Sequence, residues 1–347
     1  MIGQWSMPVL LGAFALAALV VLVGGVRLTG LADRLADRTG LGEAITGAVL
    51  LGAATSLSGS IVSITAAFDG YASLAYSNSI GGIAAQTAFL AIADVTYRKA
   101  NLEHAAAELA NVFQAVVLIV LLTLPMVAFS LPEVSLFAVH PISLLIPVVY
   151  VAALLAMRSL REAPMWQPVS TRHTRMDTAE PEDERSRAQS TSSLLAGFLL
   201  LMLLMGASGW VIAKTAAELT GRLALSESLV GAMATAVVTS LPELVTTIAA
   251  VRRGALQLAV GGIIGGNTFD TLFLTAADVS YRDGSLYHAV GMGDFFWNAA
   301  AILMTGVLLG GLILRQRMGP GRIGIESLLL LLLYAGALAL QTVRGVG

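Results

Sequence analysis

The sequence predicts an all-α polytopic membrane protein with about ten transmembrane helices, arranged as two inverted five-helix repeats. Three observations support this fold class. The 347 residues are 56% hydrophobic and only 12% charged, with a mean hydropathy of +0.81, whereas soluble proteins carry about a quarter charged residues. Apolar segments of membrane-spanning length recur along the whole chain. Finally, the two halves of the chain repeat each other.

Apolar segments of about 20 residues are long enough to cross a bilayer as helices. The first segment is too long for a cleaved signal and lacks a small-residue cleavage site, so we expect it to be a retained span. The expected spans lie near residues 7–28, 42–67, 71–96, 104–129, 139–157, 193–214, 227–250, 255–280, 287–312 and 323–343.

Residues 158–192 are rich in charge, Pro and Ser, and are expected to form a hydrophilic cytoplasmic linker. The linker divides the chain into a first five-helix repeat at 1–157 and a second at 193–347. There is no cysteine, so disulfides and thiolate metal sites are excluded.

A shift of 184 positions, the spacing between Thr55 and Thr239, aligns the two halves without a gap over residues 25–115. The string FLAIADVTYR at 89–98 then falls on FLTAADVSYR at 273–282. Chance similarity between apolar helices does not produce such a register of polar residues. Each half has an odd number of spans, so the second half must enter the bilayer upside down relative to the first.

The distribution of basic residues predicts the orientation. With the N-terminus outside, 16 of the 20 Lys and Arg residues fall in cytoplasmic segments, as the positive-inside rule requires. The four on the outer side are Lys214, Arg222, Arg282 and Arg344. Inverted repeats with a binding site at their midplane interface are a recurrent architecture of secondary transporters.

Three polar residues that are costly in lipid, Glu243, Asn267 and Asp270, lie inside two apolar segments of the second repeat. An ionisable residue at membrane depth costs at least ~2.5–3.5 kcal/mol and therefore suggests a function. Asn267 and Asp270 are three positions apart, so they share a helix face and can both point at Glu243. Two carboxylates on adjacent helices indicate a cation site.

Pro242 beside Glu243 adds further oxygen ligands to this candidate site. A proline has no backbone N–H and disturbs the carbonyl four residues earlier, so carbonyls near Val238 and Thr239 are expected to be partly freed. The hydroxyls of Thr239 and Ser240 lie beside them. Carboxylates, carbonyls and hydroxyls are the ligands that hard cations such as Ca²⁺ and Na⁺ prefer.

The motifs TSLPE at 239–243 and GGNTFD at 265–270 resemble the second repeat of the sodium/calcium exchanger (calcium:cation antiporter) superfamily. The resemblance covers essentially the whole membrane region and implies a central site of four side chains. It assigns Glu243 and Asp270 to the second-repeat corners. In the first repeat Gly59 stands where the family has a glutamate, and Gln86 takes the fourth corner.

By the same register, Thr55 and Ser56 match Thr239 and Ser240. The expected ion-binding residues are Glu243, Asp270, Asn267, Gln86, Thr239, Ser240, Thr55 and Ser56, with Glu243 and Asp270 as the charged metal ligands.

Two further repeated residues lie outside this set. Asp94 and Asp278 end their segments in the sequence ADV, and we expect them to have a paired structural role near the membrane surface, with the nearby arginine as partner. His104 and His288 open the following spans, where they are expected to be interfacial anchors.

These observations predict a secondary-active antiporter of the inner membrane that exchanges Ca²⁺ or another cation against Na⁺ or H⁺ by alternating access. A monovalent Na⁺/H⁺ exchanger, or a transport-impaired member of the same family, is the alternative. An intramembrane hydrolase lacks a nucleophile in this sequence, and a passive channel does not need buried acids beside helix breakers. We expect no enzymatic activity and no cofactor. The expected partners are the lipid bilayer and the transported cations but no nucleic acid, and the oligomeric state stays open.

Overall fold

The computed structural model describes residues 2–39, 55–97, 99–106, 108–162, 164–174, 190–319 and 323–345. Within these ranges the protein is helical, and an isolated β-bridge between Leu136 and Val139 is the only strand-like pairing. The helices are η1 (Ile2–Gln4), α1 (Met7–Thr39), α4 (Leu57–Phe68), α5 (Ala72–Thr96), α6 (Leu102–Ala105), α7 (Leu109–Ser130), α8 (Pro141–Glu162), α10 (Thr191–Leu223), α11 (Glu227–Leu229), η3 (Val230–Thr235), α12 (Ala236–Thr239), α13 (Leu241–Arg253), α14 (Leu256–Asp270), α15 (Leu272–Ser280), α16 (Leu286–Ala289), α17 (Met292–Leu314) and α18 (Ile325–Gly345).

Each of the ten expected spans corresponds to helix in the structure. Seven of the described helices are long and apolar enough to cross a membrane, and the bent combination of Glu227–Thr239 with Leu241–Arg253 adds an eighth. The second expected span is described only from residue 55, as α4, because residues 40–54 lie outside the described ranges. The repeat boundaries at 157 and 193 stay a prediction, since residues 175–189 of the linker also lie outside them.

The seventh and eighth spans are interrupted within the membrane-spanning length. The seventh bends by 44° at Ser240, between α12 and α13. Pro242 therefore lies in the first turn of α13, where its missing N–H would have no helical partner in any case. The eighth span is divided between Asp270, the last residue of α14, and Leu272, the first of α15. Both interruptions fall beside the acids of the predicted site.

The backbone repeats itself where the sequence does. Ser56 precedes α4 with φ −87° and ψ 1°, and its counterpart Ser240 precedes α13 with φ −96° and ψ 0°. Gly70 and Gly254, 184 positions apart, both adopt the left-handed conformation with φ of 86° and 88°. A positive φ is a conformation that glycine reaches at little cost. Both repeats therefore bend and turn at equivalent positions.

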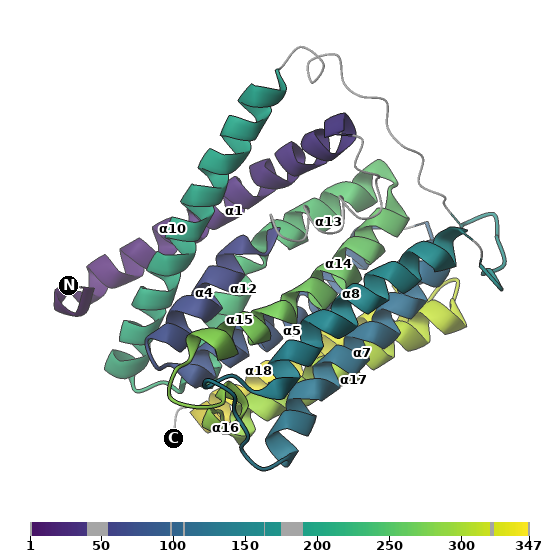
Figure 1. Ribbon diagram of the computed structural model, residues 1–347. Helices are drawn as coiled ribbons and strands as arrows, with labels where there is room; N and C mark the ends of the chain where they lie inside the picture. The colour runs from purple at the N-terminus through teal and green to yellow at the C-terminus, as the bar shows by residue number, and fades with distance from the viewer. Residues whose placement is uncertain are drawn as a thin grey trace.

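Helix α5 is the centre of the molecule. Nearly all of its side chains are buried, whereas α1 and α10 lie side by side at one edge, away from α7, α8 and α17 (Figure 1). Helix α5 packs closely on the bent seventh span, because a Cβ added at Gly81 would lie 2.5 Å from the Cα of Ala232. Small residues allow this kind of close helix contact in membranes. The contact brings the third span of one repeat against the second span of the other.

The repeats are joined by two reciprocal contacts at the ends of their third spans. In the first junction, Asp94 accepts hydrogen bonds from the backbone N–H of Leu102 (2.8 Å) and of Gly324 (3.0 Å). In the second junction, Asp278 accepts them from Leu286 (2.8 Å) and from His140 (2.7 Å). All three positions of one junction are 184 residues from their counterparts in the other. Such reciprocity is what a two-fold relation between the halves produces.

The paired structural role of the two aspartates is therefore confirmed, but an arginine is not the partner of Asp278. Arg282 donates instead to the carbonyl oxygens of Val279 and Phe137. Arg98, the corresponding neighbour of Asp94, lies outside the described residues. Backbone amides at the start of a neighbouring helix are the better partners here, because they would otherwise remain unpaired at a buried helix end.

The two histidines do not open the fourth and ninth spans. They lie in the short helices α6 and α16, and the spans begin later, at Leu109 and Met292. His104 contacts the carbonyl oxygen of Arg315 (2.6 Å), and His288 contacts that of Leu131 (2.9 Å). Arg315 and Leu131 each follow a membrane helix of the opposite repeat. Each histidine thus caps a helix of the other half.

Replacing Asp278 by alanine is expected to destabilise the protein strongly. Removing the carboxylate leaves the N–H groups of Leu286 and His140 without an acceptor in a buried position, at about 1–3 kcal/mol for each. Thermal unfolding of the detergent-purified variant measures the loss, and alanine at the exposed Asp283 is the control. Equal unfolding temperatures for the two variants would contradict the structural role of the second junction.

Candidate ion-binding site

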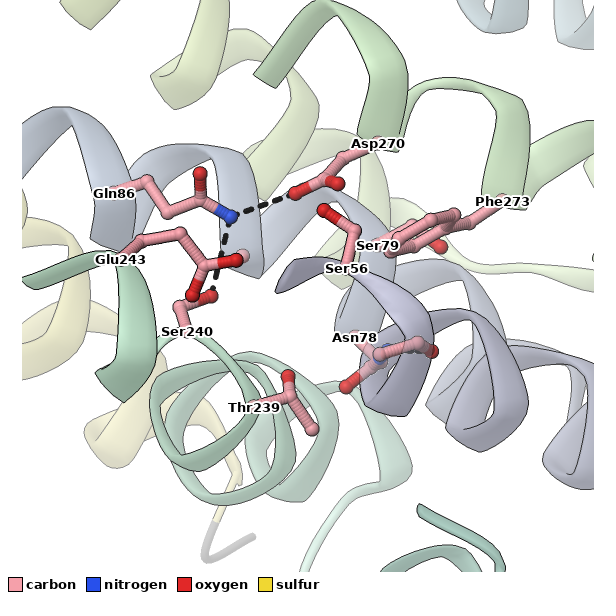
Figure 2. A pocket seen from close by; sticks show the side chains of 11 residues that line it. Ser56, Asn78, Ser79, Gln86, Thr239, Ser240, Glu243, Asp270 and Phe273 are labelled. Carbon is pink, nitrogen blue, oxygen red and sulfur yellow. Dashed lines mark hydrogen bonds between the residues drawn. The ribbon is translucent and has the colours of Figure 1, made fainter. Parts of the chain in front are cut away.

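A small polar cavity, with room for about one water molecule, lies between the two repeats, where the broken helices meet α4 and α5. Side chains from both halves line it, and Figure 2 shows Gln86, Glu243, Ser240 and Asp270 lying close together. The lining residues are Ser56, Gly59, Asn78, Ser79, Gly82, Gln86, Thr239, Ser240, Glu243, Asp270 and Phe273. The cavity therefore contains most of the residues that the sequence predicts.

Glu243 and Asp270 bring two carboxyl groups to this cavity and are almost fully buried. Among the described residues neither has a Lys, Arg or His partner. Glu243 lies in the first turn of α13, where the helix dipole favours a negative charge. Asp270 is the last residue of α14, where the negative end of the helix favours a nearby cation. Helix interruptions at a midplane site serve this purpose in transporters.

The Gln86 amide links the two repeats inside the cavity. Its Nε2 donates to the Asp270 carboxylate at 2.6 Å and to the Ser240 hydroxyl at 3.3 Å (Figure 2). Gln86 and Asp270 are 184 positions apart, so the contact joins equivalent positions of the repeats. Because a carboxylate accepts and does not donate, this contact fixes the orientation of the amide and leaves its carbonyl oxygen as an acceptor.

Five oxygen atoms of the cavity residues are buried and have no hydrogen-bond partner among the described residues. They belong to Ser56, Asn78, Gln86, Glu243 and Asp270. Buried polar atoms are nearly always paired, and an unpaired one costs about 1–3 kcal/mol. Four of the five atoms are carboxylate or amide oxygens, which accept hydrogen bonds or coordinate cations. A bound cation would satisfy several of them at once.

The remaining predicted residues occupy different positions. Thr239 lines the cavity, while its hydroxyl also donates to the Thr235 carbonyl at 2.9 Å. Thr55 lies beside Glu243 at the start of the described part of the second span, behind the lining residues. Asn267 is not in the cavity: it is fully buried and donates to the Thr87 hydroxyl at 3.0 Å. Asn267 thus packs α14 against α5 and does not point at Glu243.

Five lining residues were not among the predicted ligands: Gly59, Asn78, Ser79, Gly82 and Phe273. Asn78 donates to the Gly59 carbonyl and to the Ser63 hydroxyl, which leaves its own carbonyl oxygen as one of the five unpaired atoms. The spacing of Asn78, Gly82 and Gln86, four positions each, places them on one face of a helix and could have indicated this role. Phe273 is apolar, so no polar pattern could reveal it.

Phe273 occupies the space beside the corner that lacks a carboxylate. A Cβ added at Gly59 would lie 3.1 Å from the edge of the Phe273 ring and 3.5 Å from the Thr239 hydroxyl. Gly59 therefore faces the cavity, as its position in the repeat implies, but an aromatic ring restricts any larger side chain there. The negative charge of the site comes entirely from the second repeat.

This arrangement can bind a small cation between two carboxylates and neutral oxygens. Among the described residues no three His, Cys, Asp or Glu side chains form a group suited to a metal ion. The neutral ligands must therefore supply the rest of the coordination. Amide, hydroxyl and carboxylate oxygens suit hard cations and not the transition metals that prefer sulfur or imidazole. Two unpaired carboxyl groups can also hold protons.

Comparison with known proteins relates this chain to a family of exchangers. The profile of the family described as "Sodium/calcium exchanger protein" matches residues 9–158 and 193–343. The putative antiporter CaxA of Alkalimonas amylolytica is 26% identical over 92% of this chain and 97% of its own. The inner membrane protein YrbG of Escherichia coli (strain K12) is 31% identical, but over only 38% of each chain.

Solved structures show the same fold. An H⁺/Ca²⁺ exchanger CAX aligns with a TM-score of 0.68 over 97% of this chain and 85% of its own, at 13% identity. The sodium-calcium exchanger NCX_Mj aligns with a TM-score of 0.59 over 96% of this chain and 99% of its own, at 17% identity. The family profile covers both repeats on either side of the linker. This chain belongs to the sodium/calcium exchanger family.

Proposed function

We propose that the protein is a secondary-active antiporter that exchanges Ca²⁺, or another small cation, against Na⁺ or H⁺. Glu243 and Asp270 bind the cation through their carboxylates. Gln86, Ser56 and Asn78 contribute neutral oxygens. The observation that carries this proposal is the group of five buried oxygens without partners, which surrounds two carboxyl groups that lack a counter-charge. Because burying an uncompensated charge is costly, each carboxyl group requires either a proton or a metal cation.

Competition for the same two carboxylates supports exchange. Their combined charge neutralises one divalent cation, two Na⁺ ions or two protons. A buried site must be neutral while the two repeats change conformation around it. It will therefore carry one Ca²⁺, two Na⁺ or two protons in each direction. A third Na⁺ would need ligands that Gly59 does not provide. Exchange of one Ca²⁺ against protons or two Na⁺ therefore suits this site best.

The second candidate function is monovalent Na⁺/H⁺ exchange by the same two residues. The glycine at the first-repeat corner favours it, because fewer charges reduce the advantage of a divalent cation. Loss of transport in a divergent family member is the remaining alternative. For either exchanger, alternating access of the two repeats would expose the site to each side of an inner membrane in turn, with the N-terminus outside.

Ion flux in proteoliposomes tests the proposal. The purified protein is reconstituted, and uptake of radiolabelled Ca²⁺ and of Na⁺ is measured under imposed Na⁺ and pH gradients. We expect Ca²⁺ uptake that requires a counter-gradient of Na⁺ or H⁺. Uptake of Na⁺ driven by a pH gradient alone, with none of Ca²⁺, would support monovalent exchange. Flux independent of any counter-ion would contradict antiport.

A further inference from the structure

The two junctions between the repeats are alike in backbone but differ in several side chains. Residues 184 positions apart occupy the same place in each junction, and there Glu103 of the first stands where Tyr287 occurs in the second. The internal repeat thus supplies its own comparison, because one fold holds a carboxylic acid in one copy and a phenol in the other.

The second junction is neutral at this position and its hydroxyls are paired. The Tyr287 hydroxyl and the Ser143 hydroxyl are 2.8 Å apart, and Ser143 donates to the Asp278 carboxylate at 2.6 Å. Tyr287 is fully buried. The chain Tyr287–Ser143–Asp278 therefore has one acidic member, whose charge is stabilised by hydrogen bonds.

The first junction holds three carboxyl groups instead of one. Glu103 is 0% exposed, and among the described residues neither of its side-chain oxygens has a partner at hydrogen-bond geometry, although the hydroxyl of Ser327, the counterpart of Ser143, lies nearby. Its charged neighbours are Asp94, from the end of α5, and Glu326, from the first turn of α18. The Asn101 amide donates a hydrogen bond to the Glu326 carboxylate. Burial raises the pKa of Glu103 well above its ordinary value, and the negative charges of Asp94 and Glu326 raise it further.

No cation compensates these acids within the described residues. Arg315, at the end of α17, points its guanidinium at the carbonyl oxygens of Val169 and His104 and at the Thr174 hydroxyl. The His104 ring contacts the Arg315 carbonyl and the Thr171 hydroxyl. Helix α14, which also packs against α6, has its only acid, Asp270, at its far end. Among the described residues, Glu103, Asp94 and Glu326 do not form a group suited to a metal ion.

We propose that Glu103 is a proton-binding site of the first junction, separate from the cation site, and that release of this proton loosens the contact between the repeats. A buried, unpaired carboxyl group beside two others is stable only in its neutral form. When Glu103 ionises, a third negative charge develops next to Asp94 and repels its carboxylate. Asp94 accepts the hydrogen bonds from the N–H groups of Leu102 and Gly324, so these contacts are disturbed. The start of α18 is then less firmly held. Tyr287, at the equivalent position of the second junction, is a phenol and has no carboxylic proton to release in this pH range.

The sign of the effect on stability follows from linkage. The folded protein keeps a proton that Glu103 releases in the unfolded chain once the pH exceeds the ordinary glutamic acid value of about 4.3. Stability is therefore greatest at low pH and is lost as the pH rises towards the raised pKa of the folded state. A single proton changes the unfolding constant by up to about tenfold per pH unit.

The test compares wild type with Glu103→Gln, which is neutral at every pH, in thermal unfolding between pH 5 and 9. We expect the unfolding temperature of wild type to fall with pH relative to that of Glu103→Gln. Glu162→Gln, at an exposed acid of α8, should retain the wild-type dependence. Glu103→Tyr, which copies the second repeat, is the second variant and keeps the test valid if Glu103→Gln folds poorly.

Infrared spectroscopy provides an independent measurement. The carbonyl stretch of a protonated carboxylic acid should be present in wild type at neutral pH, weaken as the pH rises, and lose intensity in both Glu103 variants. Parallel unfolding curves for wild type and both variants, or an unchanged carbonyl band, would overturn the proposal. Neither measurement depends on transport, so the proposed function is tested separately.

Discussion

Replacing Glu243 by glutamine is expected to abolish cation exchange without unfolding the protein. Glutamine keeps the shape of the side chain but removes one of the two charges of the site. Removing one partner of a buried charge interaction costs about 3–5 kcal/mol, so Ca²⁺ affinity should fall at least ~100-fold, at 1.4 kcal/mol per tenfold. Radiolabelled Ca²⁺ uptake in proteoliposomes is then expected to drop to background.

A binding measurement separates loss of the ligand from loss of the fold. In wild type, Ca²⁺ should raise the unfolding temperature, because a ligand that binds only the folded state stabilises it. In Glu243→Gln this shift should vanish, while the unfolding temperature without Ca²⁺ stays equal or rises, since a costly buried charge is gone. Glu218→Gln, which removes a surface acid paired with Arg222 on α10, is the matched control. A normal Ca²⁺-induced shift in Glu243→Gln would exclude this residue as a ligand.

Adding a third carboxylate at Gly59 is expected to strengthen divalent binding, provided that the neighbouring ring makes room. Because a Cβ at Gly59 would lie 3.1 Å from the Phe273 ring, Gly59→Glu alone should fold and bind poorly. We expect Gly59→Glu combined with Phe273→Leu to bind Ca²⁺ at least ~10-fold more tightly than Phe273→Leu alone. A charge pair about 4 Å apart at a partly screened site contributes up to about 4 kcal/mol.

The pH dependence of this variant is part of the same prediction. Three carboxylates in one cavity repel each other, so one of them holds a proton more readily, and Ca²⁺ must displace that proton. The affinity of the double variant should therefore rise between pH 6 and 8. Gly59→Gln with Phe273→Leu has the same shape without the charge and should show neither effect. Equal affinities for the glutamate and glutamine variants would mean that position 59 does not contribute to the site.

Much of the fold and the charged part of the site could be predicted from the sequence. Span length and the 184-residue register predict ten helices in two related halves, and a carboxylate inside an apolar segment is a strong signal wherever it occurs. Helical spacing was less reliable for Asn267, because a shared face does not determine which neighbour a side chain meets. Asn267 is three positions from Asp270, yet it contacts Thr87 of α5.

The features that were missed depend on tertiary packing. Phe273 is an ordinary apolar residue in sequence, and its effect on Gly59 exists only because α15 packs against α4. The bend at Ser240 could not be placed, since a proline two residues later is compatible with a kinked helix and with a new helix start. The partners of Asp94 were also hidden, because backbone amides carry no sequence signature.

The first junction also has a consequence for biosynthesis. Asp94 accepts the N–H of Gly324, which lies 230 residues later in the chain. At about 5–20 residues per second, the ribosome needs about 10–50 s to produce that partner. During this interval the third span is complete, yet one oxygen of the Asp94 carboxylate lacks its hydrogen-bond donor. The first repeat thus reaches its final arrangement only when α18 of the second repeat enters the membrane.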